Sequence, residues 1–169
     1  MAETDPQSKA FPPYTYIPGK TPHPISDPAG HMYGEASHDT DNLEQLRWGL
    51  RLFNAGYYWE AHEAWETIWL QLPAGSHQRS WVQGLIKLAA SGVKCLEGNA
   101  NGAMRHATRA KSLFENTQSG AEWKELAEKM TVLPPVTESE GVAQPLKLAE
   151  SVPLHLDLDR CIRDFSNLT

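Results

Sequence analysis

The chain has 169 residues, of which 40% are hydrophobic, 21% charged and 9% aromatic, so it has the size of one domain with a proper core. Its formal net charge of -6 argues against a protein that holds nucleic-acid phosphates or anionic lipid along a basic face. No apolar run approaches the roughly 20 residues that span a bilayer, and the acidic, polar residues 1–5 lack the pattern of a secretion signal. We therefore predict a cytoplasmic protein, monomeric or homodimeric, with neither nucleic acid nor a membrane as its partner.

Residues 1–40 form the first region and contain seven of the 12 prolines, which excludes a helix there. Disordered segments are usually poor in aromatic and large aliphatic residues. This region is not poor in them, since it carries Phe11, Tyr14, Tyr16, Ile17 and Ile25. We therefore expect an extended Pro-rich arm that lies along the body of the protein and buries those side chains.

The second region, residues 41–133, shows helical periodicity and is expected to form the body of the fold. Asp41 and Ser76 are suitable N-caps for the first and third helices. Glycine ends helices well, which places helix ends at Gly56 and Gly98. A fifth helix is expected around Trp123 and Met130. The second helix stops before the Leu-Pro-Ala-Gly segment at residues 72–75.

Residues 134–169 form the third region, a loop followed by a short C-terminal helix that Asp157 caps. No stretch alternates with a period of two, so strands are not expected. Gly56 and Gly98 each stand five residues before an alanine, a use of small residues that is typical of tetratricopeptide-like hairpins. We predict an all-α fold: an antiparallel bundle of about five to six helices with tetratricopeptide-like hairpins, plus the extended N-terminal arm.

The second helix, residues 57–71, is the one stretch whose polar residues suggest a binding or catalytic site. At about 100° per residue most of its apolar side chains form one stripe, and Glu60, Ala64 and Thr67 lie on the face that we expect to meet solvent. His62 and Glu66 fall inside the apolar arc. A polar group that is buried there without a partner costs roughly 1–3 kcal/mol. These two residues therefore need partners or a ligand.

Residues four apart on a helix are neighbours, which leaves three roles for His62 and Glu66. They form a hydrogen-bonded structural pair, or they are two ligands of a divalent metal, or His62 is an acid or base that a carboxylate orients. Glu63 adds another carboxylate close by. A zinc-peptidase helix needs His-Glu-x-x-His, and Glu66 stands where its second histidine would be. If the arm folds across, the expected third metal ligand is His23, Asp27, His31 or His38.

The third helix carries Arg79, Gln83 and Lys87 at a spacing of four. Arg79 and Gln83 either form a solvated edge or receive a carboxylate of the second helix as part of a ligand site. We interpret Lys87 as solvated. Trp48 and Trp59 are candidates to wall a pocket or an interface, where amphipathic aromatic residues are common.

Two other groups of residues are predicted to have no chemical role. Arg105, His106 and Arg109 form a small basic patch that we interpret as solvated surface. Cys95 and Cys161 provide neither a disulfide framework nor a C-x-x-C metal clip, and no base that would activate either thiol is evident.

Residues 53–69 resemble the signature of domain-of-unknown-function family 309, in which a Phe-Asn-x-Gly turn precedes Glu-Ala-His-Glu-x-x-Glu on a helix. The second block of that family, Gln-Gly-Leu-Ile followed by Gly-Asn-x-x-Gly-Ala, is similar to residues 83–86 and 98–103. The resemblance covers about residues 42–115, and residues 16–31 are similar to an extension that some members carry. It implies an all-helical fold and points to His62, Glu63 and Glu66. It implies no particular reaction, because the family has no assigned activity.

Three functions remain open from the sequence. The first is a binding module whose polar pocket around His62 and Glu66 takes a small-molecule ligand or a divalent metal, the candidate cofactor. The second is a metal-assisted hydrolase or lyase that uses the same residues, although no catalytic residue is assigned. The third is a structural or interaction protein in which His62 and Glu66 are only a buried packing pair.

Overall fold

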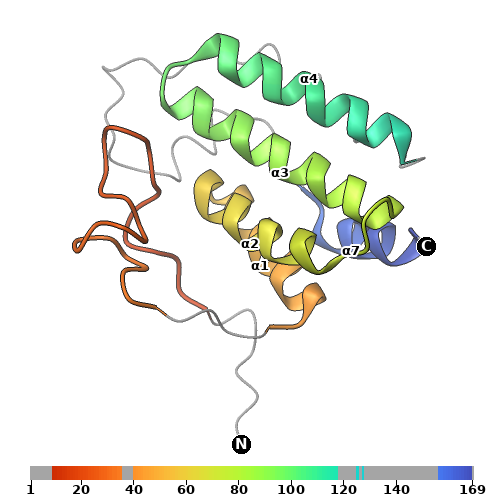
Figure 1. Ribbon diagram of the computed structural model, residues 1–169, viewed down its shortest axis with the longest axis horizontal. Coiled ribbons are helices and arrows are strands. Elements are labelled where there is room, and N and C mark those ends of the chain that lie inside the picture. Colours follow the sequence, from red (N-terminus) through yellow and green to blue (C-terminus); the bar gives the residue numbers. More distant parts are fainter. Residues whose placement is uncertain (1–8, 36–39, 118–124, 126, 128–155, 169) are drawn as a thin grey trace, which may run out of the picture.

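The computed structural model describes residues 9–35, 40–117, 125, 127 and 156–168. This part of the chain forms five α-helices and no strand (Figure 1), so the all-α prediction is confirmed. The helices are α1 (Asn42–Asn54), α2 (Tyr58–Gln71), α3 (His77–Leu96), α4 (Ala100–Asn116) and α7 (Leu158–Asn167). The helix expected around Trp123 and Met130 lies outside the described residues, except for Glu125 and Ala127.

The helices begin and end where local capping chemistry predicts. The Asp41 carboxylate accepts hydrogen bonds from two backbone N–H groups in the first turn of α1. The Ser76 hydroxyl and the Asp157 carboxylate each accept one such bond, at the start of α3 and α7. Gly56 and Gly98 adopt the positive φ values of 86° and 77° that favour glycine at helix ends. These five boundaries confirm the prediction from the sequence.

Helices α1 to α4 pack as consecutive antiparallel neighbours, with α3 in contact with both α2 and α4 (Figure 1). Two glycines of α3 allow side chains of α2 and α4 to approach its backbone closely. A Cβ atom at Gly84 would lie 2.5 Å from the Phe114 ring of α4, and one at Gly92 would lie 2.5 Å from the Tyr58 ring of α2. Helix α3 is consequently the most deeply buried of the helices, with Trp81 and Leu88 fully inside.

The arm, residues 9–35, lies at the end of the bundle where α2 begins, α3 ends and α4 begins (Figure 1). Ile17 is buried in the common core, as predicted. Phe11 is 39% exposed, yet its ring stacks on Trp48 and Tyr57 at centroid distances of 5.9 and 5.3 Å. The expectation that Ile25 is buried was wrong, since Ile25 is 48% exposed.

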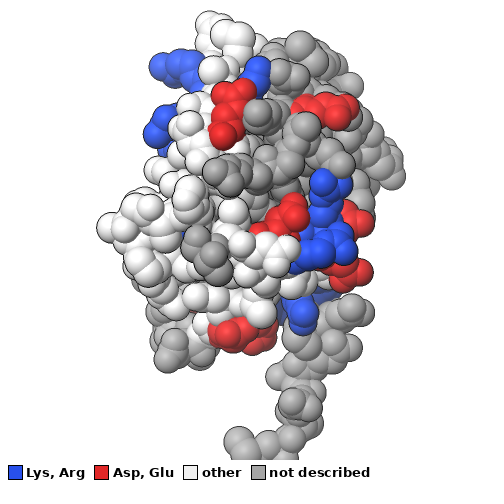
Figure 2. All heavy atoms as spheres, turned by 90° about the vertical axis from the view of Figure 1, so that its right-hand side faces the viewer, with Lys and Arg blue, Asp and Glu red and all other residues white. Residues whose placement is uncertain are grey.

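The C-terminal helix α7 packs against α1, and residues from all three regions share one core. The Asn54 side chain bonds both the backbone N–H and the carbonyl of Leu156, at 2.8 and 2.9 Å. The Phe165 ring lies 6.0 Å from Trp81 of α3. No helix in the described part of the chain is long and apolar enough to cross a membrane. On the face shown in Figure 2, acidic and basic side chains are intermixed.

Candidate functional site

Helix α2 brings His62, Glu63 and Glu66 together on one part of its surface. One ligand atom from each side chain lies within 4.8 Å of the others, and all three residues are half-buried. The His62 Nδ1 atom is 3.3 Å from Glu63 Oε1, and these side chains are 28% and 29% exposed. The expected neighbour relation of His62 and Glu66 on successive turns is therefore present, with Glu63 as a third member.

The spacing of these atoms suits a metal ion. Two ligand atoms that each lie about 2.1 Å from a tetrahedral ion are separated by roughly 3.4 Å. The distance from His62 Nδ1 to Glu63 Oε1, 3.3 Å, already has that value. A carboxylate oxygen of Glu66 is within 4.8 Å of the ligand atoms of both. Three protein ligands would leave coordination positions open to water or to a ligand.

Of the arm residues that the sequence suggested as the third ligand, His38 lies outside the described residues, and the others do not join this group. His31 Nε2 lies 3.0 Å from Glu60 Oε1, and its side chain is 5% exposed. His23 Nδ1 accepts hydrogen bonds from the backbone N–H groups of Ile25 and Ser26, both at 3.3 Å. This turn directs Ile25 outward, which explains why that side chain is not buried. In the described part of the chain the third potential ligand is Glu63, from α2 itself.

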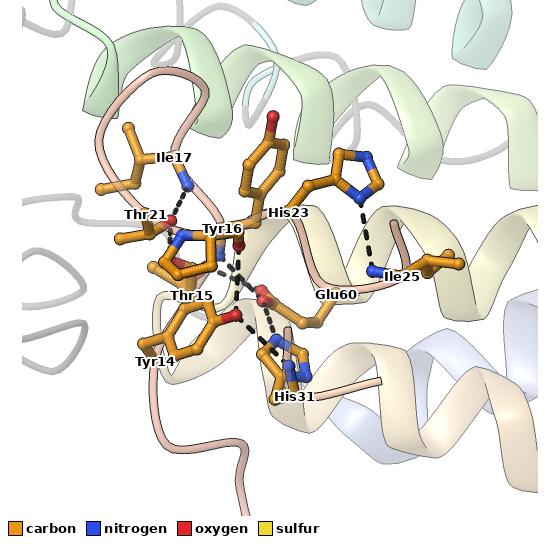
Figure 3. A network of polar contacts seen from close by, with 10 residues as sticks. Tyr14, Thr15, Tyr16, Ile17, Thr21, His23, Ile25, His31 and Glu60 are labelled. Atoms are coloured by element: carbon orange, nitrogen blue, oxygen red, sulfur yellow. Dashed lines mark hydrogen bonds and ion pairs between the residues drawn. The ribbon is translucent and has the colours of Figure 1, made fainter. Parts of the chain in front are cut away.

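Glu60 occupies a buried position that the sequence pattern missed. We expected Glu60 and Ala64 to face solvent, and this was wrong, because they are only 4% and 8% exposed. The arm covers Glu60, and its polar groups satisfy the carboxylate (Figure 3). Glu60 accepts hydrogen bonds from the Thr15 hydroxyl at 2.7 Å and from the backbone N–H of Tyr16 at 2.9 Å, in addition to its contact with His31. Among the residues that the structure describes, the buried histidine–carboxylate pair is therefore His31–Glu60.

The predicted pocket residues take other partners. Trp59 is half-buried and packs edge-on against Tyr16 and His23, at centroid distances of 5.3 and 5.6 Å, so it holds the arm on α2. Arg79 donates to the Leu72 carbonyl at 2.6 Å, and its guanidinium lies 4.0 Å from the centre of the Trp69 ring. Arg79 therefore stabilises the turn between α2 and α3.

Gln83 and Lys87 are half-buried on α3, four residues apart on the same side of the helix. Gln83 makes no hydrogen bond with any residue of the described ranges. Gln83 therefore remains a candidate ligand-binding residue, with its amide available.

His106 of α4 is a functional candidate that the sequence analysis missed. Arg105 and Arg109 are exposed, as predicted for a solvated patch, whereas His106 is half-buried. Burial lowers the pKa of His106 below its ordinary value, and the nearby cations Lys87, Lys94 and Arg105, together with His62, lower it further. His106 thus belongs to the electrostatic surroundings of His62. In the sequence, the only indication that His106 is partly buried was its place next to Ala107, which is buried on α4.

The two cysteines are free and buried. Burial raises the pKa of both thiols, which disfavours the reactive thiolate. This agrees with the expectation that neither Cys95 nor Cys161 takes part in chemistry.

Comparison with known proteins gives a match to one family model over part of the chain. Residues 46–106 match the family model described as Domain of unknown function (DUF309). This range contains most of α1, all of α2 and α3, and the whole His62–Glu63–Glu66 group. No curated protein and no solved structure matches the chain. The resemblance inferred from the sequence motifs is thereby confirmed for this part of the chain.

Proposed function

We propose that this chain, whose residues 46–106 form a DUF309 domain, is a binding module that holds a divalent metal ion between His62, Glu63 and Glu66. The observation that carries the proposal is the convergence of one ligand atom from each side chain within 4.8 Å. One imidazole and two carboxylates suit first-row ions such as zinc, manganese or iron. The open coordination positions would receive a small-molecule ligand.

The exposure of the group favours a ligand site over a packing pair. A structural pair stabilises a fold when burial makes its hydrogen bond hard to replace by water. His62 and Glu63 are 28% and 29% exposed, and Glu66 makes no hydrogen bond to any residue that the structure describes. The buried pair His31–Glu60 already fixes the arm on this helix. A purely structural role therefore explains His62, Glu63 and Glu66 poorly.

The direct test measures manganese binding to the full chain by electron paramagnetic resonance of free Mn²⁺, with zinc competition. We expect stoichiometric binding by the parent protein and a loss of at least about tenfold in affinity for His62→Ala and Glu66→Ala. His77→Ala is the matched control, because His77 is exposed at the start of α3. His23→Ala is also expected to bind normally. Parent protein that binds neither ion, or a His62→Ala variant that binds as well as the parent, would refute the proposal.

A metal-assisted hydrolase or lyase is the second candidate function. The observation that favours it is that three protein ligands leave room for a metal-bound water, as catalytic sites do. Its test is turnover of phosphate-ester and ester substrates by metal-loaded and chelator-treated protein. Activity that is lost when the metal is removed, and also in His62→Ala, would support catalysis. Metal binding without turnover would contradict catalysis and agree with a binding module.

A further inference from the structure

Helix α3 exposes a single narrow stripe next to the candidate metal site. From Trp81 to Leu96 every residue is buried except Gln83, Lys87, Ala90 and Lys94, which are half-buried. Their spacing of four, three and four residues places them on one side of the helix. The stripe therefore carries two lysines and an amide on a surface that is otherwise closed by packing.

This stripe faces the edge of α2 that carries the metal group. Arg79 precedes Gln83 by four residues, so it extends the same side of α3, and it stacks on Trp69 of α2 at 4.0 Å. Trp69 lies three residues after Glu66 and therefore on the same edge of α2 as Glu66. The α3 stripe and the His62–Glu66 edge of α2 thus border one common face of the helix layer.

Helix α4 packs against α3 and carries the half-buried His106. Burial lowers the pKa of His106, and Lys87, Lys94, Arg105 and His62 lower it further. The lowered pKa of His106 leaves its imidazole uncharged at neutral pH, so it offers one N–H donor and does not repel a metal ion.

The two lysines differ in their partners. Lys94 Nζ is 2.7 Å from Glu97 Oε2, so its charge is neutralised within α3. Lys87 makes no ion pair with any residue in the described ranges, although it is half-buried. A divalent ion would balance the charges of Glu63 and Glu66. Gly92 lies against Tyr58 and Arg79 against Trp69, so the antiparallel register of α2 and α3 sets Lys87 level with His62.

We propose that this face binds a phosphate-class oxyanion, held between the metal ion at His62, Glu63 and Glu66 and the ammonium group of Lys87. A lysine is a common point-charge partner of phosphate, and an oxyanion that also coordinates the metal would satisfy both positive centres. The inference rests on the proposed function, whose ligand class it specifies.

The test is equilibrium dialysis of radiolabelled inorganic phosphate against the full chain, with and without Mn²⁺, while Mn²⁺ binding is measured separately. We expect manganese-dependent phosphate binding that weakens about tenfold in Lys87→Ala, because one charge-assisted contact is lost. Arg109→Ala, an exposed cation of α4, is the matched control and is expected to bind as the parent does.

The outcomes separate the two proposals. Manganese binding without phosphate binding, or phosphate binding that is equal in Lys87→Ala and the parent, overturns this inference and leaves the metal site in place. Protein that binds neither manganese nor phosphate overturns both. Unchanged manganese affinity in Lys87→Ala shows that this variant is folded, so a loss of phosphate binding then reports on Lys87 itself.

Discussion

Replacing Glu60 tests whether the buried carboxylate fixes the N-terminal arm on α2. The carboxylate only accepts hydrogen bonds, so Thr15, Tyr16 and His31 are its donors, at 2.7, 2.9 and 3.0 Å. Glu60→Ala removes all three acceptor contacts at a site where Glu60 is 4% exposed. The Thr15 hydroxyl can rotate to another acceptor, whereas the Tyr16 backbone N–H and the ring N–H of His31 cannot.

The magnitude follows from these two stranded donors. Each buried donor without an acceptor costs about 1–3 kcal/mol, so we expect Glu60→Ala to lower the free energy of unfolding by about 2–6 kcal/mol. Glu60→Gln keeps one acceptor oxygen for Tyr16 and His31, and its amide group can donate to Thr15. Its cost should therefore be about half as large, since mainly the charge of the acceptor is lost.

Urea unfolding, followed by tryptophan fluorescence and far-ultraviolet circular dichroism, measures these differences. Glu66→Ala is the matched control on the same helix and is expected to change the free energy of unfolding by less than about 0.5 kcal/mol. Trypsin cleavage after the exposed Lys20 reports release of the arm and should accelerate in Glu60→Ala. A cost below about 1 kcal/mol with unchanged cleavage, or an equal cost for Glu66→Ala, would refute this account of the arm.

Three further substitutions test packing, electrostatics and the C-terminal attachment. Gly92→Ala places a methyl group 2.5 Å from the buried Tyr58 ring, so we expect a loss of about 1–3 kcal/mol in urea unfolding; a neutral result would show that α2 and α3 separate easily. His106 has a lowered pKa in the folded protein, so the unfolded chain binds more protons, and stability should fall as the pH decreases through about 6.5. His106→Asn should flatten that part of the stability profile, and an unchanged slope would contradict the assignment. Asn54→Ala leaves the Leu156 N–H and carbonyl without their bonds and should cost about 1–3 kcal/mol by the same unfolding assay, whereas no loss would mean that water replaces both bonds.

The sequence by itself determined the helix boundaries and the metal-ligand candidates on α2. Helix caps such as Asp41 and Ser76 act within one turn, and side chains four residues apart are neighbours on any helix, so both can be inferred without knowledge of the fold. The same local reasoning brought His62 and Glu66 together correctly.

Only the tertiary structure decided which polar residue of α2 is buried and which distant side chains border the site. Glu60 is covered by Thr15, a residue 45 positions away, and His106 meets the surroundings of His62 through the packing of α4 on α3. A hydrophobic pattern describes one helix in isolation. It therefore cannot show that a distant segment covers a polar residue and supplies hydrogen-bond donors to it. Burial and charge at this site depend on contacts between chain segments, and these exist only once the arm and the helices have packed.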